Sequence, residues 1–193
     1  MGPPITAGEI KRTREECIRR LLAASTISCI AGHCPMPKAE GWLDENGLRD
    51  ALTPFESESI FRNVKPMVFF YMPYCTWGLA WALNIVPELL PGKVLPDTVA
   101  ANLPLVNPKV YAHDIFERAT LRPIEEILQM LDICCCVQAA YEDQQKRGKF
   151  PNNIKMKWEW VEHQRCALEW LIRDKPWDEL ATGWRKGMPW HHA

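Results

Sequence analysis

The sequence has almost no net charge to direct it toward a partner. It carries 23 lysines and arginines against 24 aspartates and glutamates, a formal charge of -1 over 193 residues. Without an excess of either sign, no overall field draws the chain to a nucleic acid or to an anionic membrane surface. We therefore expect neither of these as its partner.

Signals for export and for zinc or redox clips are also missing. The chain begins Met1-Gly-Pro-Pro-Ile-Thr6, without the basic segment, apolar run and cleavage site of a secretory signal, so we expect a cytoplasmic protein. No two of its eight cysteines have the Cys-x-x-Cys spacing of a zinc site or a redox motif. Three are consecutive, Cys134 to Cys136, and on a helix they point about 100° apart. We expect reduced thiols that contribute small apolar surface.

No segment alternates clearly as a strand, whereas helical spacing recurs with start and stop signals. Hydrophobic residues at 47% and charged residues at 24% are typical of a globular protein, and the length suffices for a core without disulfides or metals. The predicted helices are 7–30 from a Thr6–Glu9 capping box, 39–46 before Gly47, one from Pro54, 97–102, 107–119, 123–148 and one after Asn153.

These patterns predict an all-α fold, a single compact orthogonal bundle of about six to eight helices with a proline-rich central loop at 87–108. Residues 1–193 are expected to form one domain, with the core at about 7–180 and a tail at 181–193.

Residues 67–86 contain no charged side chain and are long enough to cross a bilayer. Pro73, Gly78, Asn84 and several aromatic residues interrupt the segment, and no second hydrophobic stretch accompanies it. A helix that is apolar all round lies in a core or in a membrane. We favour a buried central helix that bends or starts near Pro73, and expect no membrane span.

The last long helix carries one residue that does not suit its apolar face. Arg165 lies at helical spacing with Val161 and Leu168, and a buried guanidinium needs carboxylates or carbonyls as acceptors. The predicted buried polar cluster joins Arg165 to Glu126, Asp132 or Asp178. We favour a structural ion pair; the alternative is the polar pocket of an enzyme or a small-ligand-binding protein.

Signals for catalysis and for metals are weak. Cys29, His33 and Cys34 are close in sequence but lack zinc spacing and a fourth ligand, so we expect no metal site. Cys75 and Cys166 have no identifiable base, and motifs of the hydrolase, kinase and dinucleotide-binding kinds are absent. We lean against an enzyme and expect no cofactor.

The first predicted helix is locally basic, but acidic residues interleave with its cations. Glu9, Glu15 and Glu16 alternate with Lys11, Arg12, Arg14, Arg19 and Arg20. This pattern favours a solvated face with ion pairs over a stripe that binds a phosphate backbone.

Several segments, in order and spacing, resemble a known bacterial family. They are Gly41-Trp-Leu-Asp-Glu-Asn-Gly-Leu-Arg-Asp-Ala-Leu-Thr-Pro54, Trp81-Ala-Leu-Asn-Ile-Val-Pro-Glu-Leu-Leu-Pro91, Leu121-Arg-Pro-Ile-Glu-Glu-Ile-Leu128, Ala167-Leu-Glu-Trp-Leu171 and Trp177-Asp178. Together they resemble domain-of-unknown-function family 4272 over about residues 10–180. The resemblance implies a helical fold and brings no activity or catalytic residues.

Two departures from the family pattern concern polar residues. Members typically have an arginine and a glutamate where this chain reads Tyr71-Met-Pro-Tyr-Cys-Thr76, and an acidic residue and threonine where it reads Thr182-Gly183. If those polar residues form a shared site in the family, this chain has lost part of it.

Nine tryptophans are unusual for this length. Trp177, Trp184 and Trp190 gather where the chain becomes polar and rich in glycine, and tryptophan is enriched at interface hot spots. They are either a partner-binding element or a cover for the core. Our leading hypothesis is a non-enzymatic protein-binding domain, an immunity protein that neutralises a bacterial toxin; a homo-oligomer remains open.

Overall fold

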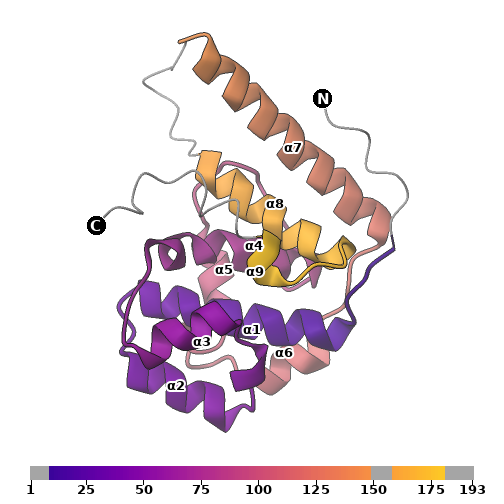
Figure 1. Ribbon diagram of the computed structural model, residues 1–193. Helices are drawn as coiled ribbons and strands as arrows, with labels where there is room; N and C mark the ends of the chain where they lie inside the picture. Colours follow the sequence, from indigo (N-terminus) through magenta and orange to yellow (C-terminus); the bar gives the residue numbers. More distant parts are fainter. Residues whose placement is uncertain (1–8, 149–157, 181–193) are drawn as a thin grey trace.

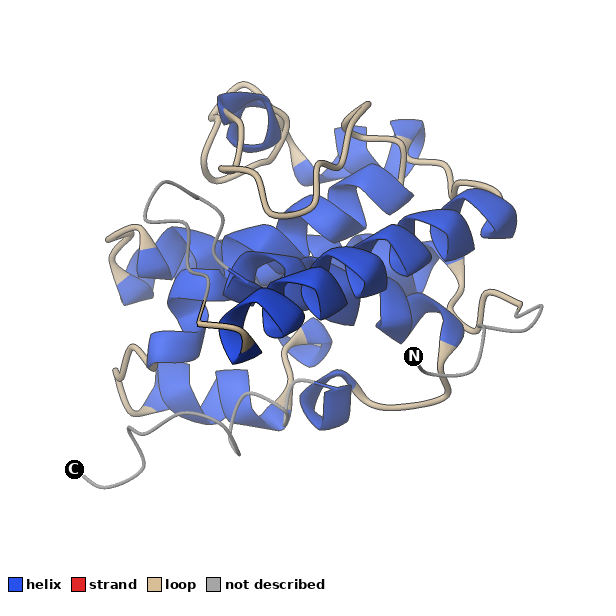
Figure 2. Cartoon of the chain, turned by 90° about the horizontal axis from the view of Figure 1, so that it is seen from above, coloured by secondary structure: helices blue, strands red, loops and turns tan. Residues whose placement is uncertain are grey.

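The computed structural model describes residues 9–148 and 158–180, which form nine α-helices and two short 3-10 helices (Figure 1). In chain order they are α1 Arg14–Ala31, α2 Met36–Glu45, η1 Arg49–Ala51, α3 Pro54–Phe61, η2 Met67–Tyr71, α4 Met72–Ala82, α5 Asp97–Ala101, α6 Ala112–Arg118, α7 Ile124–Lys146, α8 Trp158–Ile172 and α9 Trp177–Leu180. The described residues contain no strand, as Figure 2 shows, and the predicted all-α class is confirmed.

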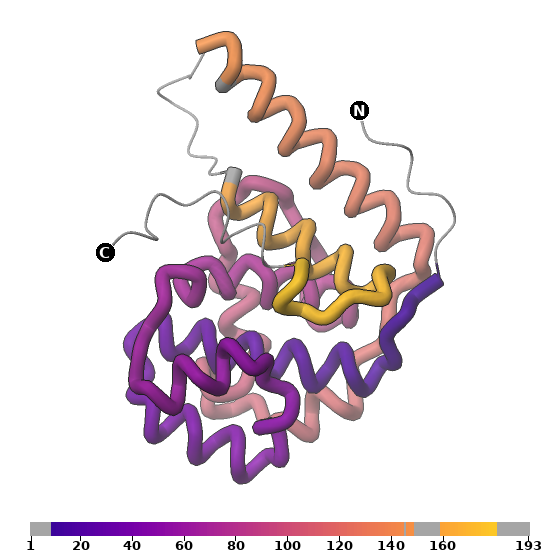
Figure 3. Tube along the Cα trace, viewed as in Figure 1, coloured from indigo at the N-terminus to yellow at the C-terminus, as the bar shows by residue number. Residues whose placement is uncertain are grey.

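Helix α1 is the centre of the arrangement. Nearly all of its residues from Cys17 to Ala31 are buried, whatever their direction around the axis. A helix covered on all sides must have neighbours on all sides. In Figure 1, α2 and α3 lie on one side of it and α4 and α8 on the other, while the far end of α7 extends beyond the rest of the body (Figure 3).

The start of α1 differs from the prediction. The helix begins after Thr13, whose side chain accepts from the Glu16 amide, while the Glu16 carboxylate accepts from the Thr13 amide at 2.6 Å. Before it, the Lys11 amide donates to the Leu171 carbonyl at 2.7 Å, so residues 9–12 lie along the end of α8. This contact between distant segments, which sequence spacing cannot reveal, displaces the predicted Thr6–Glu9 start.

The uncharged segment 67–86 contains the predicted buried central helix, α4, while Met67, Phe70 and Asn84 on either side of it are exposed. Pro73 lies in the first turn of α4, where its missing amide hydrogen is not needed, and η2 precedes it. Gly78 lets α4 approach α8, because a Cβ there would lie 3.1 Å from Ala167 Cβ and 3.3 Å from the Gln164 carbonyl oxygen. None of the helices in residues 9–148 and 158–180 has the length and hydrophobicity needed to cross a bilayer.

Other boundaries follow local signals to different degrees. Helix α3 starts at Pro54 behind a Thr53–Glu56 capping box, as predicted. Helix α6 begins at Ala112 and not near Pro108, because the Asp114 carboxylate accepts from the Tyr111 amide at 2.8 Å and defines the first turn there. Helix α8 is described from Trp158 onward, so its predicted start after Asn153 lies outside the described residues.

The basic residues near α1 form the predicted ion-paired, solvated face only in part: Lys11 pairs with Glu9 and Arg19 with Asp50 at the surface, whereas Arg12 and Arg14 bind helix ends. Arg12 donates to the carbonyls of Trp170, Arg173 and Lys175 at the end of α8, with its guanidinium 5.0 Å from the Trp170 ring centroid. Arg14 donates to the Phe116 and Ala119 carbonyls at the end of α6. Cations at these ends satisfy carbonyls that lack partners within their helices. The arginines thus join helix ends to the centre.

Candidate ligand pocket

The predicted cluster around Arg165 is not formed. Arg165 pairs with Glu169, four residues away on the same helix, at 3.1 Å, and keeps 26% of its side chain exposed. Glu126 pairs with Arg122 at 2.9 Å, Asp132 is exposed on α7, and no ion pair joins either of them or Asp178 to Arg165 in the described residues. A partner one helical turn away is in reach without bringing another helix close, and the prediction considered only distant acids.

Trp177 covers the core and is not a surface contact. It is buried, lies edge-on to Trp170 with ring centroids 5.6 Å apart, and has the Arg20 guanidinium 4.4 Å from its ring centroid. This is the second of the two roles that the sequence left open. Trp184 and Trp190 lie outside the described residues, and their predicted binding role stays a prediction.

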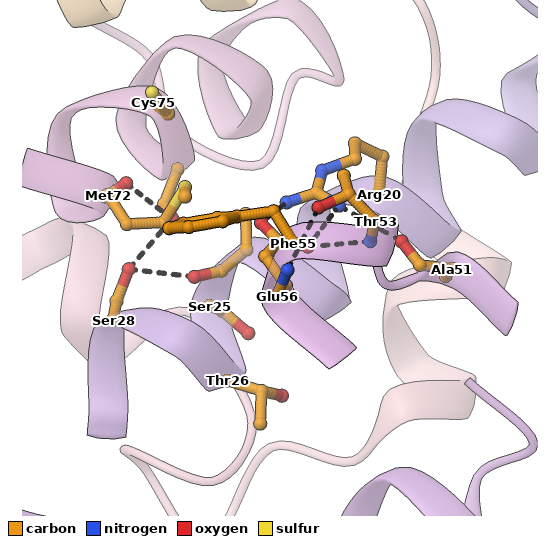
Figure 4. A network of polar contacts seen from close by, with 12 residues as sticks. Arg20, Ser25, Thr26, Ser28, Ala51, Thr53, Phe55, Glu56, Met72 and Cys75 are labelled. Carbon is orange, nitrogen blue, oxygen red and sulfur yellow. Dashed lines mark hydrogen bonds and ion pairs between the residues drawn. The ribbon is translucent and has the colours of Figure 1, made fainter. Parts of the chain in front are cut away.

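The buried ion pair of the described core joins Arg20 to Glu56. Their side chains are 5% and 2% exposed, and Arg20 Nη1 donates to Glu56 Oε2 at 2.8 Å and to the Ala51 carbonyl at 3.0 Å. Glu56 also accepts from the Thr53 amide at 2.9 Å, so the capping carboxylate of α3 is the acceptor for α1 (Figure 4). With Trp177 on the guanidinium, this contact joins α1, α3 and α9. The contact is internal, since both side chains are almost fully buried.

The sequence contains one signal for the burial of Arg20, which was not used in the prediction. Arg20 lies three residues after Cys17 and four before Ala24, so it is on the buried stripe of α1. The prediction grouped it with the neighbouring cations by charge. Helical spacing would have separated it from them.

A cavity of about 490 Å³ lies among the end of α1, the start of α2, the start of α4 and the segment containing α5. Sites for small molecules commonly have about 300–1,000 Å³ and are largely apolar with a few polar groups. The polar side chains that line it are Ser25, Ser28, Cys29, His33, Cys34, Lys38 and Thr76. The apolar wall consists of Pro35, Pro73, Leu95, Val99, Ala100, Leu103, Leu105 and Val106, with Gly32 completing the lining.

Hydroxyl groups form the inner polar surface of the cavity. Ser28 Oγ and Thr76 Oγ1 are 3.0 Å apart, and they also lie 2.8 Å from the Ala24 carbonyl and 3.0 Å from the Met72 carbonyl respectively. Ser25 donates to the Leu22 carbonyl at 2.8 Å. Each hydroxyl has one hydrogen and two lone pairs, so these internal bonds use the hydrogens and leave lone pairs. This surface accepts hydrogen bonds more readily than it donates them.

The mouth of the cavity is shaped by the end of α1. The Cys34 amide donates to the Cys29 carbonyl at 2.8 Å and the His33 amide to the Ile30 carbonyl at 3.2 Å, while His33 has φ 74. This is a Schellman end with histidine where glycine is usual. It turns the chain at once into Pro35 and α2, and so leaves the exposed His33 and Lys38 at the rim.

The chemistry of this lining does not favour catalysis by a thiolate. Burial, with a contribution from nearby Cys34, raises the pKa of the Cys29 thiol to about 12, against an opposing effect of Lys38. At neutral pH the thiol therefore keeps its proton, and the thiolate is the nucleophilic form. No cluster of three or more histidine, cysteine or acidic side chains suited to a metal occurs in the described part of the chain.

The sequence flagged Cys29, His33 and Cys34 only as weak zinc ligands, and did not flag the hydroxyls or Lys38. A local signal was the series Ser25, Thr26 and Ser28 in the otherwise apolar second half of α1, directly before a proline-rich break. The opposite wall comes from residues some 70 positions away, as Val99 against Ser28 illustrates, and local spacing carries no trace of it.

Comparison with known proteins gives one family match. The sequence profile described as "Domain of unknown function (DUF4272)" matches residues 3–180. No curated protein and no solved structure matches the chain.

Proposed function

This chain belongs to the DUF4272 family, whose function is unknown, and we propose from its cavity that it is a cytoplasmic binding protein that holds a small amphipathic molecule without catalysis. The observation that carries this proposal is the cavity of about 490 Å³ with an apolar wall and a hydroxyl-lined interior. The sequence already offered a small-ligand-binding protein as the alternative function, but with its pocket around Arg165. The cavity lies elsewhere.

The difference in exposure along the lining supports the binding of a ligand. The interior residues Ser25, Thr76 and Val99 are buried, whereas His33 and Lys38 at the rim are exposed. One end of the cavity is therefore buried and the other faces solvent. A molecule with an apolar body fits the buried end, because removing its apolar surface from water there is favourable. Its polar group stays at the rim.

Filling the cavity should abolish binding of a neutral apolar probe. Ala100 lines the cavity and Ala101, its neighbour on α5, is exposed, so Ala100→Trp and Ala101→Trp form a matched pair. We expect the fluorescent probe N-phenyl-1-naphthylamine to bind the unaltered protein and Ala101→Trp alike, and to bind Ala100→Trp at least about tenfold more weakly, a loss of about 1.4 kcal/mol. Equal binding by both variants, or no binding by the unaltered protein, would contradict the proposal.

A second candidate function is the protein-binding role of the leading sequence hypothesis, and an exposed apolar surface favours it. Phe61 is 88% exposed and Met67 55%, with Val64 and Phe70 nearly half exposed between and beside them. We name residues 61–70 the 61–70 surface. Exposed aromatic and methionine side chains are enriched at protein interfaces. Lys65 lies within the 61–70 surface and has no ion pair in the described residues. A partner that complements this surface would have an apolar patch bordered by carboxylates.

In its finer form this candidate is an immunity protein whose partner is a bacterial toxin. The double variant Phe61→Ser/Met67→Ser should lose a stoichiometric partner in affinity capture, while Val94→Ser, at another exposed valine, should retain it. Both variants should keep stability within about 0.5 kcal/mol, because the altered residues are on the surface. A partner captured equally by both variants would contradict this role, and a doubled mass in light scattering that the double variant abolishes would assign the surface to a second copy.

A further inference from the structure

We infer that the pocket selects a monoanionic amphiphile, an aliphatic carboxylate whose head lies at Lys38 and whose chain enters between α1 and α5. This inference rests on the proposed ligand-binding function and adds the chemical class of the ligand. Three features carry it: the charge of the lining, the hydrogen bonds that occupy the inner hydroxyls and the composition of the apolar wall.

The lining contains a cation and no carboxylate. Of the described residues that border the cavity, Lys38 carries a full positive charge and none is aspartate or glutamate. The nearest acid on α2, Glu40, is paired with Arg49 at 3.6 Å, and Lys38 has no ion pair in the described part of the chain. Its charge is close enough to Cys29 to oppose the rise in the pKa of that thiol. An anion at the rim therefore gains a charge partner without displacing one.

The inner end of the cavity cannot serve as the anion site. Ser25, Ser28 and Thr76 have three hydroxyl hydrogens for four contacts, three to carbonyls and one between Ser28 and Thr76, so no hydrogen is left over and the interior presents lone pairs. Lone pairs repel carboxylate oxygens, whereas the Lys38 ammonium offers three donors. The head is thereby directed outward and the chain inward.

The apolar wall and the single lysine restrict the chemical class of the ligand further. Val99 and Leu103 are buried apolar residues on one side of the cavity, which suits an aliphatic chain. No arginine is among the described lining residues, so a phosphate dianion at Lys38 would keep one negative charge without a permanent cation beside it. One lysine matches one negative charge.

The test compares three amphiphiles of equal chain length by isothermal calorimetry at low and high salt: octanoate, 1-octanol and octylammonium. We expect octanoate to bind about fivefold more tightly than octanol at low salt, the effect of one partly exposed ion pair, and octylammonium to bind more weakly than octanol. The preference for octanoate should shrink at high salt.

Variants at two lysines locate the effect. Lys38→Met keeps the length of the side chain and should make octanoate and octanol bind equally, Lys38→Arg should restore the preference, and Lys146→Met, at an exposed lysine in the last turn of α7, should leave it unchanged. Circular dichroism confirms that each variant is folded.

The outcomes separate this inference from the function on which it rests. If octanol and the neutral naphthylamine probe bind but octanoate has no advantage, or if Lys38→Met keeps the advantage, the anionic class is wrong and the pocket remains a ligand site. If none of the amphiphiles binds and the neutral probe also fails, the ligand-binding function itself is overturned.

Discussion

Replacing Arg20 with methionine is expected to lower the free energy of unfolding by about 3 to 5 kcal/mol. The Glu56 carboxylate, 2% exposed, would lose its cation, and α3 would keep a buried charge at its start. Removal of one member of a buried pair costs more than the pair itself contributes, because the remaining ion stays desolvated. Urea denaturation followed by far-ultraviolet circular dichroism measures the loss.

The adjacent arginine gives a matched control for this prediction. Arg19 pairs with Asp50, whose side chain is 79% exposed, so Arg19→Met should cost less than about 1 kcal/mol. Adding Glu56→Gln to Arg20→Met removes the orphaned charge and should recover part of the stability. If the two single arginine variants lose equal stability, the Arg20–Glu56 pair does not have the structural role assigned to it.

A loss of stability in mild acid is expected from His163. This side chain is buried at the contact between α8 and α4, stacks on Tyr71 with centroids 4.9 Å apart, and its Nδ1–H donates to the Glu159 carbonyl. Burial lowers the pKa of His163 to about 4, against the smaller opposing effect of that hydrogen bond. In the unfolded chain the pKa of a histidine is about 6.5.

The sign follows from which state takes up the proton. Above pH 6.5 neither state is protonated at His163, and the full stability is present. As the pH falls from about 6.5 to about 4, His163 becomes protonated in the unfolded chain but stays neutral in the folded chain. The free energy of unfolding therefore falls by up to about 3 kcal/mol.

His163→Phe isolates this contribution from those of the carboxylates, since the variant keeps an aromatic ring against Tyr71 but cannot titrate. The difference in unfolding free energy between the unaltered protein and the variant should change steadily between pH 6.5 and 4 and stay constant above pH 7. A difference that is flat over the whole range would mean that His163 is protonated equally well in both states.

Helix starts illustrate what local sequence can predict. Thr53, Pro54 and Glu56 contain within four residues the acceptor, the fixed backbone angle and the return carboxylate that start α3, and the prediction was confirmed. The start of α1 was wrong because Thr6 and Glu9 carry the same pattern as Thr13 and Glu16, and the choice between them follows from the contact of Lys11 with Leu171.

The candidate site was much less predictable than the fold. Arg165 attracted attention as a charge on an apolar stripe, yet Arg20 is the buried one, because burial depends on how many neighbouring helices surround a residue. The pocket joins Ser28 to residues around Val99 and to Thr76, which belong to three separate elements. Each of these residues alone is unremarkable in sequence.

The sequence by itself determined that the chain is all-α, that α3 starts at Pro54 and that a buried helix starts near Pro73, since capping, proline geometry and the lack of charge act within a few residues. Only the tertiary structure decided the pairing of Arg20 with Glu56, the burial of Trp177 and the cavity beside Lys38. The physical reason is that salt bridges, stacking and enclosed volume depend on distances between helices, and these are set by the packing of the whole core.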